Sequence, residues 1–169
     1  MEDKKQKTID YINEVLKPPR EEFGGLPVCP FAGPELDNGK LMIDIINEEQ
    51  SLDFLLDKYK NSKYNSALLI LELPDGEILT SEETDQFEIF VDKTIKNKGY
   101  KDIKTICFNP NDNVSINGFN PRRKAPYFLI NIAGREELHK AHKSLTKTNY
   151  YDNMDVKYKS FLKIGGKNG

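Results

Sequence analysis

The chain has 169 residues and a net charge of −2, with 37% hydrophobic residues, 31% charged residues, nine Phe and eight Tyr. This length and this content of apolar and aromatic residues are enough for a folded domain with a core of its own. The small negative net charge disfavours general nucleic-acid binding and attraction to anionic membranes. The longest apolar run, residues 67–71, is far shorter than a membrane span, and the charged residues 1–5 do not resemble a signal peptide, so we expect a cytoplasmic protein.

The first 39 residues are predicted to form one helix and one ordered loop. Apolar residues recur at helical spacing over residues 5–16, and Pro18 ends this helix because proline cannot continue it. Prolines and glycines follow one another closely over residues 20–39. Closely spaced prolines and glycines disfavour helices and strands, so this segment is predicted to be an ordered loop without either.

From residue 40 onward, short apolar runs alternate with amphipathic stretches. Thr80 and Glu83 form a candidate capping box at the start of one helix, and Gly99 ends that helix. The predicted elements are strand 41–47, helix 51–61, strand 67–73, a turn at 74–76, the helix between Thr80 and Gly99, strand 103–108, loop 109–125, strand 127–132 and helix 135–145.

The resulting order, β-α-β-α-β-β-α, predicts an α/β protein of the α+β type. Two crossovers followed by a strand pair favour a mixed four-stranded sheet, because parallel neighbours need a crossover and antiparallel neighbours do not. We prefer a two-layer, ferredoxin-like sandwich. A three-layer, thioredoxin-like arrangement is the alternative, although helix 51–61 lacks the cysteine expected at its start.

Several finer expectations accompany this fold. The run 67–73 is apolar throughout, which predicts a central strand covered on both faces. Residues 1–163 form one domain, 164–169 a flexible tail, and a further helix is expected around 156–162. Most X-Pro bonds are trans, and a trans Ala125–Pro126 bond would argue against the thioredoxin-like alternative, which places a cis-proline before the equivalent strand.

The first candidate for chemistry is Cys29, in a loop with prolines on both sides. A rigid loop can aim a thiol, and a cation or a helix N-terminus can favour the thiolate that acts as nucleophile or ligand. The alternative is a buried structural cysteine, since free cysteine is among the most buried residue types. Cys29 and Cys107 form no C-x-x-C pair, a pattern typical of reduced thiols.

The second candidate is the long loop 109–125, in which Arg122, Arg123 and Lys124 are consecutive cations. Arginine can bind a carboxylate or phosphate through paired donors, so this cluster is a candidate anion site, with Asn109 and Tyr127 as polar positioning groups. A solvated basic turn is the alternative. Loops of this length in compact domains are usually functional or disordered.

Other common site types find little support. His139 and His142 stand at i, i+3 on a predicted helix without a carboxylate or Cys partner at motif spacing, so no metal site is predicted. The chain also contains no Gly-rich phosphate loop, serine nucleophile elbow or H-E-x-x-H motif. The sequence therefore specifies no cofactor.

Three segments resemble a bacterial family known as domain of unknown function 1415. That family typically carries an opening helix, a G-L-x-L-C-P-F-A segment, an F-H-P strand end and an R-S-P-Y-P strand start; the counterparts here are residues 25–32 (GLPVCPFA), 108–110 (FNP) and 124–127 (KAPY). The resemblance spans about residues 5–148 and implies a shared fold without an established activity. Asn109 replaces the family's His and Lys124 its Arg, whereas Cys29 is retained.

These candidates lead to two functional hypotheses. In the first, the protein is a small cytosolic enzyme that acts on an anionic metabolite, with Cys29 as thiolate nucleophile or ligand and the basic cluster as anion clamp. In the second, it is a non-catalytic interaction domain in which Cys29 is structural and loop 109–125 meets a protein partner. The enzyme hypothesis requires Cys29 and the segment 122–127 to converge on one concave site.

Overall fold

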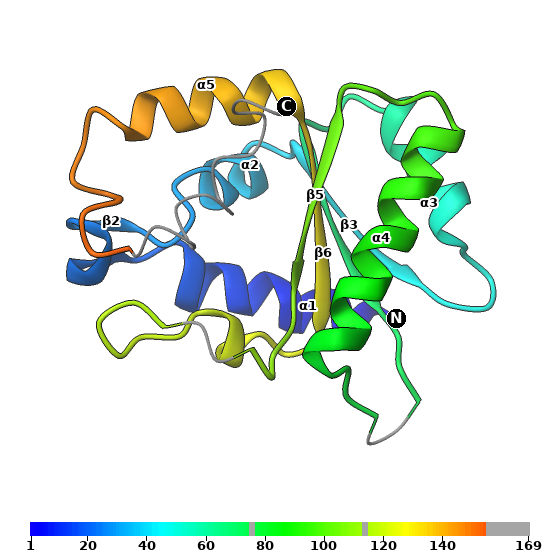
Figure 1. Ribbon diagram of the computed structural model, residues 1–169, viewed down its shortest axis with the longest axis horizontal. Coiled ribbons are helices and arrows are strands. Elements are labelled where there is room, and N and C mark those ends of the chain that lie inside the picture. Colours follow the sequence, from blue (N-terminus) through cyan, green and yellow to red (C-terminus); the bar gives the residue numbers. More distant parts are fainter. Residues whose placement is uncertain (75–76, 113–114, 155–169) are drawn as a thin grey trace.

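A mixed four-stranded sheet forms the centre of the computed structural model, which describes residues 1–74, 77–112 and 115–154 (Figure 1). Its strands are β3 (Leu41–Ile46), β4 (Ser66–Leu71), β5 (Ile103–Phe108) and β6 (Phe128–Gly134), in the order β3-β4-β6-β5. Strand β3 is parallel to β4, whereas β6 is antiparallel to both of its neighbours, β4 and β5. The α+β class, the mixed sheet and the order β-α-β-α-β-β-α are confirmed.

Strand β4 lies inside the sheet, as its continuous apolar run predicts. Leu68 and Ile70 pack into the hydrophobic cluster on one face, and Ala67 and Leu69 pack into the cluster on the other. All four side chains are almost completely buried. Apolar residues at consecutive positions are therefore needed here because both faces of this strand are covered.

Helices cover the two faces of the sheet. Helices α3 (Leu52–Lys60) and α4 (Ser81–Asn97) lie on one face, and α1 (Glu2–Tyr11), α2 (Ala32–Asp37) and α5 (Arg135–Leu145) lie on the other (Figure 1). The sheet and the α3–α4 layer form the sandwich that the sequence predicts. The remaining helices add the second helical layer that the three-layer alternative describes.

The N-terminal segment differs from the prediction in two places. Helix α1 begins at Glu2 and continues as a π-helical turn, η1 (Ile12–Leu16), which ends before Pro18. The prediction of a loop without regular structure over residues 20–39 is wrong. This segment contains a short hairpin, β1 (Pro19–Arg20) with β2 (Leu26–Pro27), the 3-10 turn η2 (Glu21–Phe23) and helix α2. Pro34 is tolerated in α2 because it lies in the first turn, where its missing N–H is not needed.

Helix α4 has the boundaries that its capping residues predict. The Thr80 hydroxyl accepts a hydrogen bond from the Glu83 N–H at 3.1 Å, and the Glu83 carboxylate accepts one from the Thr80 N–H at 3.2 Å. Gly99 follows the helix with φ +74°, a backbone conformation that glycine adopts without strain. Val91 and Ile95 face the core, whereas Phe90, on the apolar pattern of this helix, is 54% exposed.

The loop between β5 and β6 contributes to the core. Ile116 and Phe119 form an isolated antiparallel bridge around the turn Asn117-Gly118, both of whose residues have positive φ. Ile116 and Phe119 are themselves buried in the hydrophobic cluster on the face of the sheet that α1, α2 and α5 cover. The 3-10 turn η3 (Arg122–Lys124) then leads into β6, and no peptide bond between described residues is cis, including Ala125–Pro126.

Three expectations fall on residues 155–169, which are not described: the helix around 156–162, the domain boundary at 163 and the tail 164–169.

None of the helices in the described part combines the length and apolar character that crossing a bilayer requires. Cys29 and Cys107 are free thiols, as their spacing predicts.

Candidate functional site

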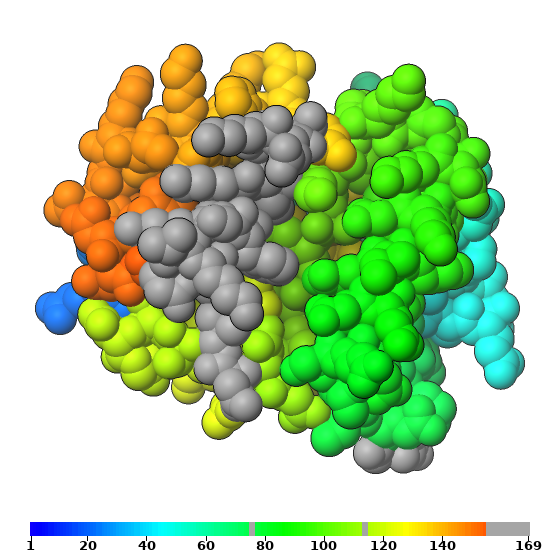
Figure 2. Space-filling model, viewed as in Figure 1, coloured from blue at the N-terminus to red at the C-terminus, as the bar shows by residue number. Residues whose placement is uncertain are grey.

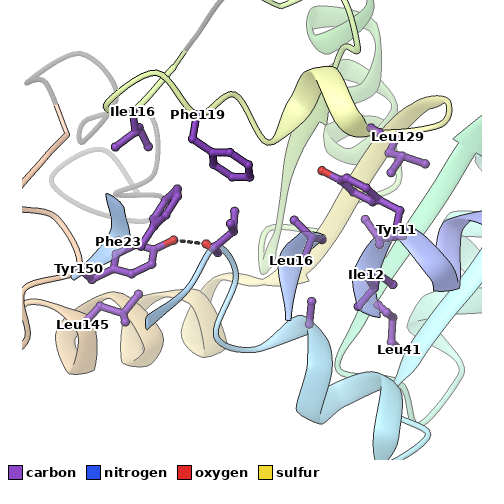
Figure 3. Close-up of a cluster of buried hydrophobic side chains, with 14 of the residues drawn as sticks. Tyr11, Ile12, Leu16, Phe23, Leu41, Ile116, Phe119, Leu129, Leu145 and Tyr150 are labelled. Atoms are coloured by element: carbon purple, nitrogen blue, oxygen red, sulfur yellow. Dashed lines mark hydrogen bonds between the residues drawn. The ribbon is translucent and has the colours of Figure 1, made fainter. Parts of the chain in front are cut away.

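A cavity of about 390 Å³ lies between α2, α5 and the sheet, on the face that α1 also covers. Most of its wall is apolar, and Tyr11, Leu16, Leu41, Leu145 and Tyr150 contribute to it. Figure 3 shows these side chains in two groups, with Tyr11, Leu16 and Leu41 on one side and Leu145 and Tyr150 on the other. On α5, Leu138, Ala141 and Leu145 face inward as predicted, and all three line the cavity.

Cys29 borders this cavity, and backbone hydrogen bonds fix its loop. The Cys29 N–H donates to the Leu16 carbonyl at 3.2 Å, and the Tyr150 hydroxyl donates to the Val28 carbonyl (Figure 3). The loop is thereby tied to the end of η1 on one side and to the segment after α5 on the other. The side chain is partly exposed and lines the cavity wall.

The surroundings of the Cys29 sulfur favour the neutral thiol. Burial raises the pKa of Cys29 above its ordinary value, and the negative charge of Glu35 adds to this effect. Hydrogen bonds from the N–H groups of Phe31 and Ala32, at the start of α2, act in the opposite direction but are outweighed. Among the described residues, the surroundings of Cys29 therefore do not supply the cationic environment, lowering the pKa of this thiol, that the enzyme hypothesis expects.

A carboxyl group that sequence reasoning missed lines the same cavity. Glu35, in the first turn of α2, hydrogen-bonds with the Ser66 hydroxyl at the start of β4. Burial raises the pKa of Glu35, the Ser66 hydrogen bond lowers it, and the charge of Glu137 on α5 raises it further, with a net increase. Ser66 and Glu137 also line the cavity. The Cys29 thiol and the Glu35 carboxyl group, whose pKa is raised, therefore line the same cavity.

Arg122 is the one cation of the predicted clamp that lines the cavity. Its side chain is 7% exposed, forms an ion pair with Asp112, and lies over the Phe108 ring at 5.5 Å from the ring centre. Arg123 and Lys124 are exposed and are not part of the cavity wall. Because successive residues of the 3-10 turn η3 point in different directions, the three cations do not converge on one site.

Asn109 and Tyr127 lie outside the cavity wall. Asn109 is buried, and its side-chain amide donates to the Leu79 carbonyl at 2.8 Å and to the Thr84 hydroxyl at 2.9 Å. It thereby connects the end of β5 to the start of α4. The Tyr127 ring lies beside α1, with the Lys4 ammonium 5.8 Å from its centre.

The two histidines have different surroundings. His139 is exposed, whereas His142 borders the cavity with its Nδ1 2.9 Å from the Tyr151 hydroxyl. Burial raises the pKa of Tyr151 to about 12, so this hydroxyl stays protonated at neutral pH. Within the described residues, no group of three His, Cys, Asp or Glu side chains is placed to hold a metal ion.

Known proteins add no assignment to this geometry. No protein-family model, no curated protein and no solved structure matches the chain.

Proposed function

We propose that the protein is a small enzyme that binds a compact, largely apolar metabolite with one anionic group in the cavity and acts on it through Cys29. The observation that carries this proposal is that Cys29 and Arg122, from distant segments of the chain, line the same cavity of about 390 Å³. A mostly apolar pocket with a few polar groups is the usual form of a small-molecule site. Arg123, Lys124, Asn109 and Tyr127 do not enter the proposal.

Glu35 supplies the proton acceptor that a neutral thiol needs. Cys29 is protonated at neutral pH because burial raises its pKa, so it becomes a nucleophile only if a base takes its proton during attack. With an acyl substrate, the Sγ–C bond forms as the thiol proton passes to the Glu35 carboxylate. The Glu35 carboxylic acid then returns this proton to the departing oxygen or nitrogen, which leaves a thioester on Cys29. Water hydrolyses the thioester and restores the thiol.

Arg122 supports the anionic part of the substrate. Among the described residues of the cavity wall, Arg122 is the buried arginine or lysine, whereas Lys140 is exposed. The Asp112 carboxylate offsets part of its charge. We therefore expect a moderate preference for anionic ligands rather than an absolute requirement.

A second candidate function is a non-catalytic interaction domain in which Cys29 is structural. The raised pKa of Cys29 and the hydrogen bonds that fix its loop favour this alternative. The buried Ile116 and Phe119 also give loop 109–125 a structural role of its own. In that case the cavity binds no small molecule and Cys29 can be replaced without loss of function.

Two further points belong to this proposal. A cytoplasmic location agrees with the two free thiols, which persist in a reducing compartment. Kinship with the bacterial family of domain of unknown function 1415 is supported by the three motifs, of which GLPVCPFA includes Cys29 and four further residues that line the cavity.

The proposal is tested by the charge preference of Cys29 alkylation. The rate with iodoacetate, an anion, is divided by the rate with neutral iodoacetamide, so that differences in general accessibility cancel. We expect Arg122→Gln to lower this ratio several-fold, Arg122→Lys to preserve most of it, and the exposed control Arg123→Gln to leave it unchanged. Thermal melts confirm that each variant is folded. A ratio that is the same in all four proteins would contradict the role of Arg122.

A further inference from the structure

Helix α4 presents large apolar side chains to solvent at its middle. Ile89 is 55% exposed and Phe90 54% exposed, although Val91 and Ile95 on the opposite side of the same helix are buried. In Figure 2, α4 forms the bright green surface on the right of the face shown. An isolated exposed apolar residue is ordinary, but two adjacent ones at the centre of a long helix form the core of a candidate interface.

The charges on this face are arranged symmetrically about Ile89, with opposite signs. Asp85 and Lys93 lie four positions before and after Ile89, and Glu82 and Lys96 lie seven positions before and after it. At 3.6 residues per turn, these residues follow one stripe along the helix. All four charged side chains are exposed, and no ion pair between described residues involves any of them.

We propose that this stripe of α4 is a self-complementary interface that pairs two copies of the chain with their α4 helices antiparallel. A two-fold axis at Ile89 places Asp85 of each copy beside Lys93 of the other, and Glu82 beside Lys96. The same operation brings Ile89 of both copies together at the centre, and Phe90, about 100° further around the helix, lies at the edge of the contact. Interfaces with two-fold symmetry use one patch on both subunits, so the patch must complement itself.

The charge pattern selects this orientation and this partner. A parallel pairing would place Glu82 against Glu82 and Lys96 against Lys96, which is repulsive. The antiparallel pairing makes both of these charged pairs opposite in sign and leaves Asp92 opposite the neutral Gln86. Charge complementarity of this kind fixes register and orientation. The cavity lies on the other face of the sheet, so the dimer leaves it open and does not depend on the proposed enzymatic function.

The interface is small, so the dimer is reversible. A face one helix wide buries less than the roughly 800 Å² per partner of a standard interface. We therefore expect dissociation in the micromolar range, and weaker association at high salt because exposed charges are screened.

Sedimentation velocity of the full chain between about 10 and 500 µM measures this association. We expect the wild type to shift from monomer to dimer over this range. Asp85→Lys and Lys93→Asp should each be monomeric, because each places like charges opposite one another across the two-fold axis. An equimolar mixture of the two variants should form a heterodimer, since both facing pairs are then opposite in sign. The double variant should dimerise with itself again.

Matched controls carry the same charge changes elsewhere. Glu48→Lys and Lys143→Asp alter exposed residues outside α4, and their association should equal that of the wild type. The proposal is overturned if the wild type stays monomeric at 500 µM, if both single variants dimerise like the wild type, or if the mixture associates no better than its components. The mixing result requires both variants to be folded, so recovery of the heterodimer also excludes misfolding as the cause of lost self-association.

Discussion

The Tyr150 hydroxyl donates a hydrogen bond to the carbonyl of Val28, the peptide group directly before Cys29. This contact joins the segment after α5 to the loop that carries the thiol, and both border the cavity. The Tyr150 ring also packs against Phe23, with 5.4 Å between ring centres. The position of Cys29 therefore depends on a residue far along the chain.

Tyr150→Phe removes this hydrogen bond and leaves the Val28 carbonyl with one partner fewer. We expect a loss of about 1 kcal/mol in the free energy of unfolding, and faster alkylation of Cys29 in the native state because its loop opens more often. Tyr59→Phe is the matched control, since Tyr59 packs on the other face of the sheet and is not part of the cavity wall, and its hydroxyl donates to the Asn65 carbonyl at 2.7 Å rather than to the loop of Cys29. The control should lose similar stability without a change in the Cys29 rate. Equal Cys29 rates in both variants would show that Tyr150 does not hold the loop.

Asp44 makes the stability of the fold depend on pH. Burial acts to raise its pKa, but hydrogen bonds from Lys58, Gln50 and the Ile45 N–H lower the pKa more, with a net decrease from 3.8. A carboxyl group with a depressed pKa in the folded state contributes stability above its unfolded pKa of about 3.9, and this contribution is lost as the pH falls through the folded value.

Asp44→Asn should therefore lower the free energy of unfolding at pH 7, and the difference from the wild type should shrink below about pH 4. Urea titrations at several pH values measure this. Asp53→Asn is the control: its carboxylate forms an exposed ion pair with Lys98, and such pairs contribute little. A difference for Asp44→Asn that stays constant down to pH 2.5 would rule out the depressed pKa.

Leu69 in β4 tests the double-sided burial of the central strand. Its side chain is fully buried, so Leu69→Ala should cost about 2–5 kcal/mol, and Leu69→Asp should unfold the domain because an unpaired charge would be buried. Phe54→Asp, at a position 53% exposed on α3, should change the melting temperature by only a few degrees. A Leu69→Asp protein that melts close to the wild type would contradict the central placement.

Most helices and strands of this fold could be predicted because the residues that specify them, the apolar spacing, the turns and the capping residues, lie within each element or beside it. Turns flank β5 at both ends, and α4 carries its own capping box, so the predicted boundaries of both elements agree closely with the structure. Helix α2 was missed because its short, Pro- and Gly-containing sequence has the composition of a loop. Its core contacts form only when η1 and β3 pack around it.

The candidate site was predicted only in part, for a related reason. Cys29 stood out by its flanking prolines, whereas Glu35 lies in the missed helix α2 and carries no motif. Which of Arg122, Arg123 and Lys124 turns inward depends on the 3-10 turn η3, which three consecutive cations do not indicate. The cavity itself has no sequence signal, since Leu138 and Ala141 would look the same in a filled core.

The most direct test of the central claim, that this cavity binds a compact apolar anion beside Cys29, is an NMR titration of the ¹⁵N-labelled full chain with benzoate. We expect amide shifts to cluster at residues that line the cavity, such as Ser66, Asn131 and Ala141, and to be smaller with neutral benzamide. The shifts should disappear after Cys29 is alkylated with iodoacetamide. Shifts that are scattered over the surface, or that alkylation of Cys29 leaves unchanged, would contradict the claim.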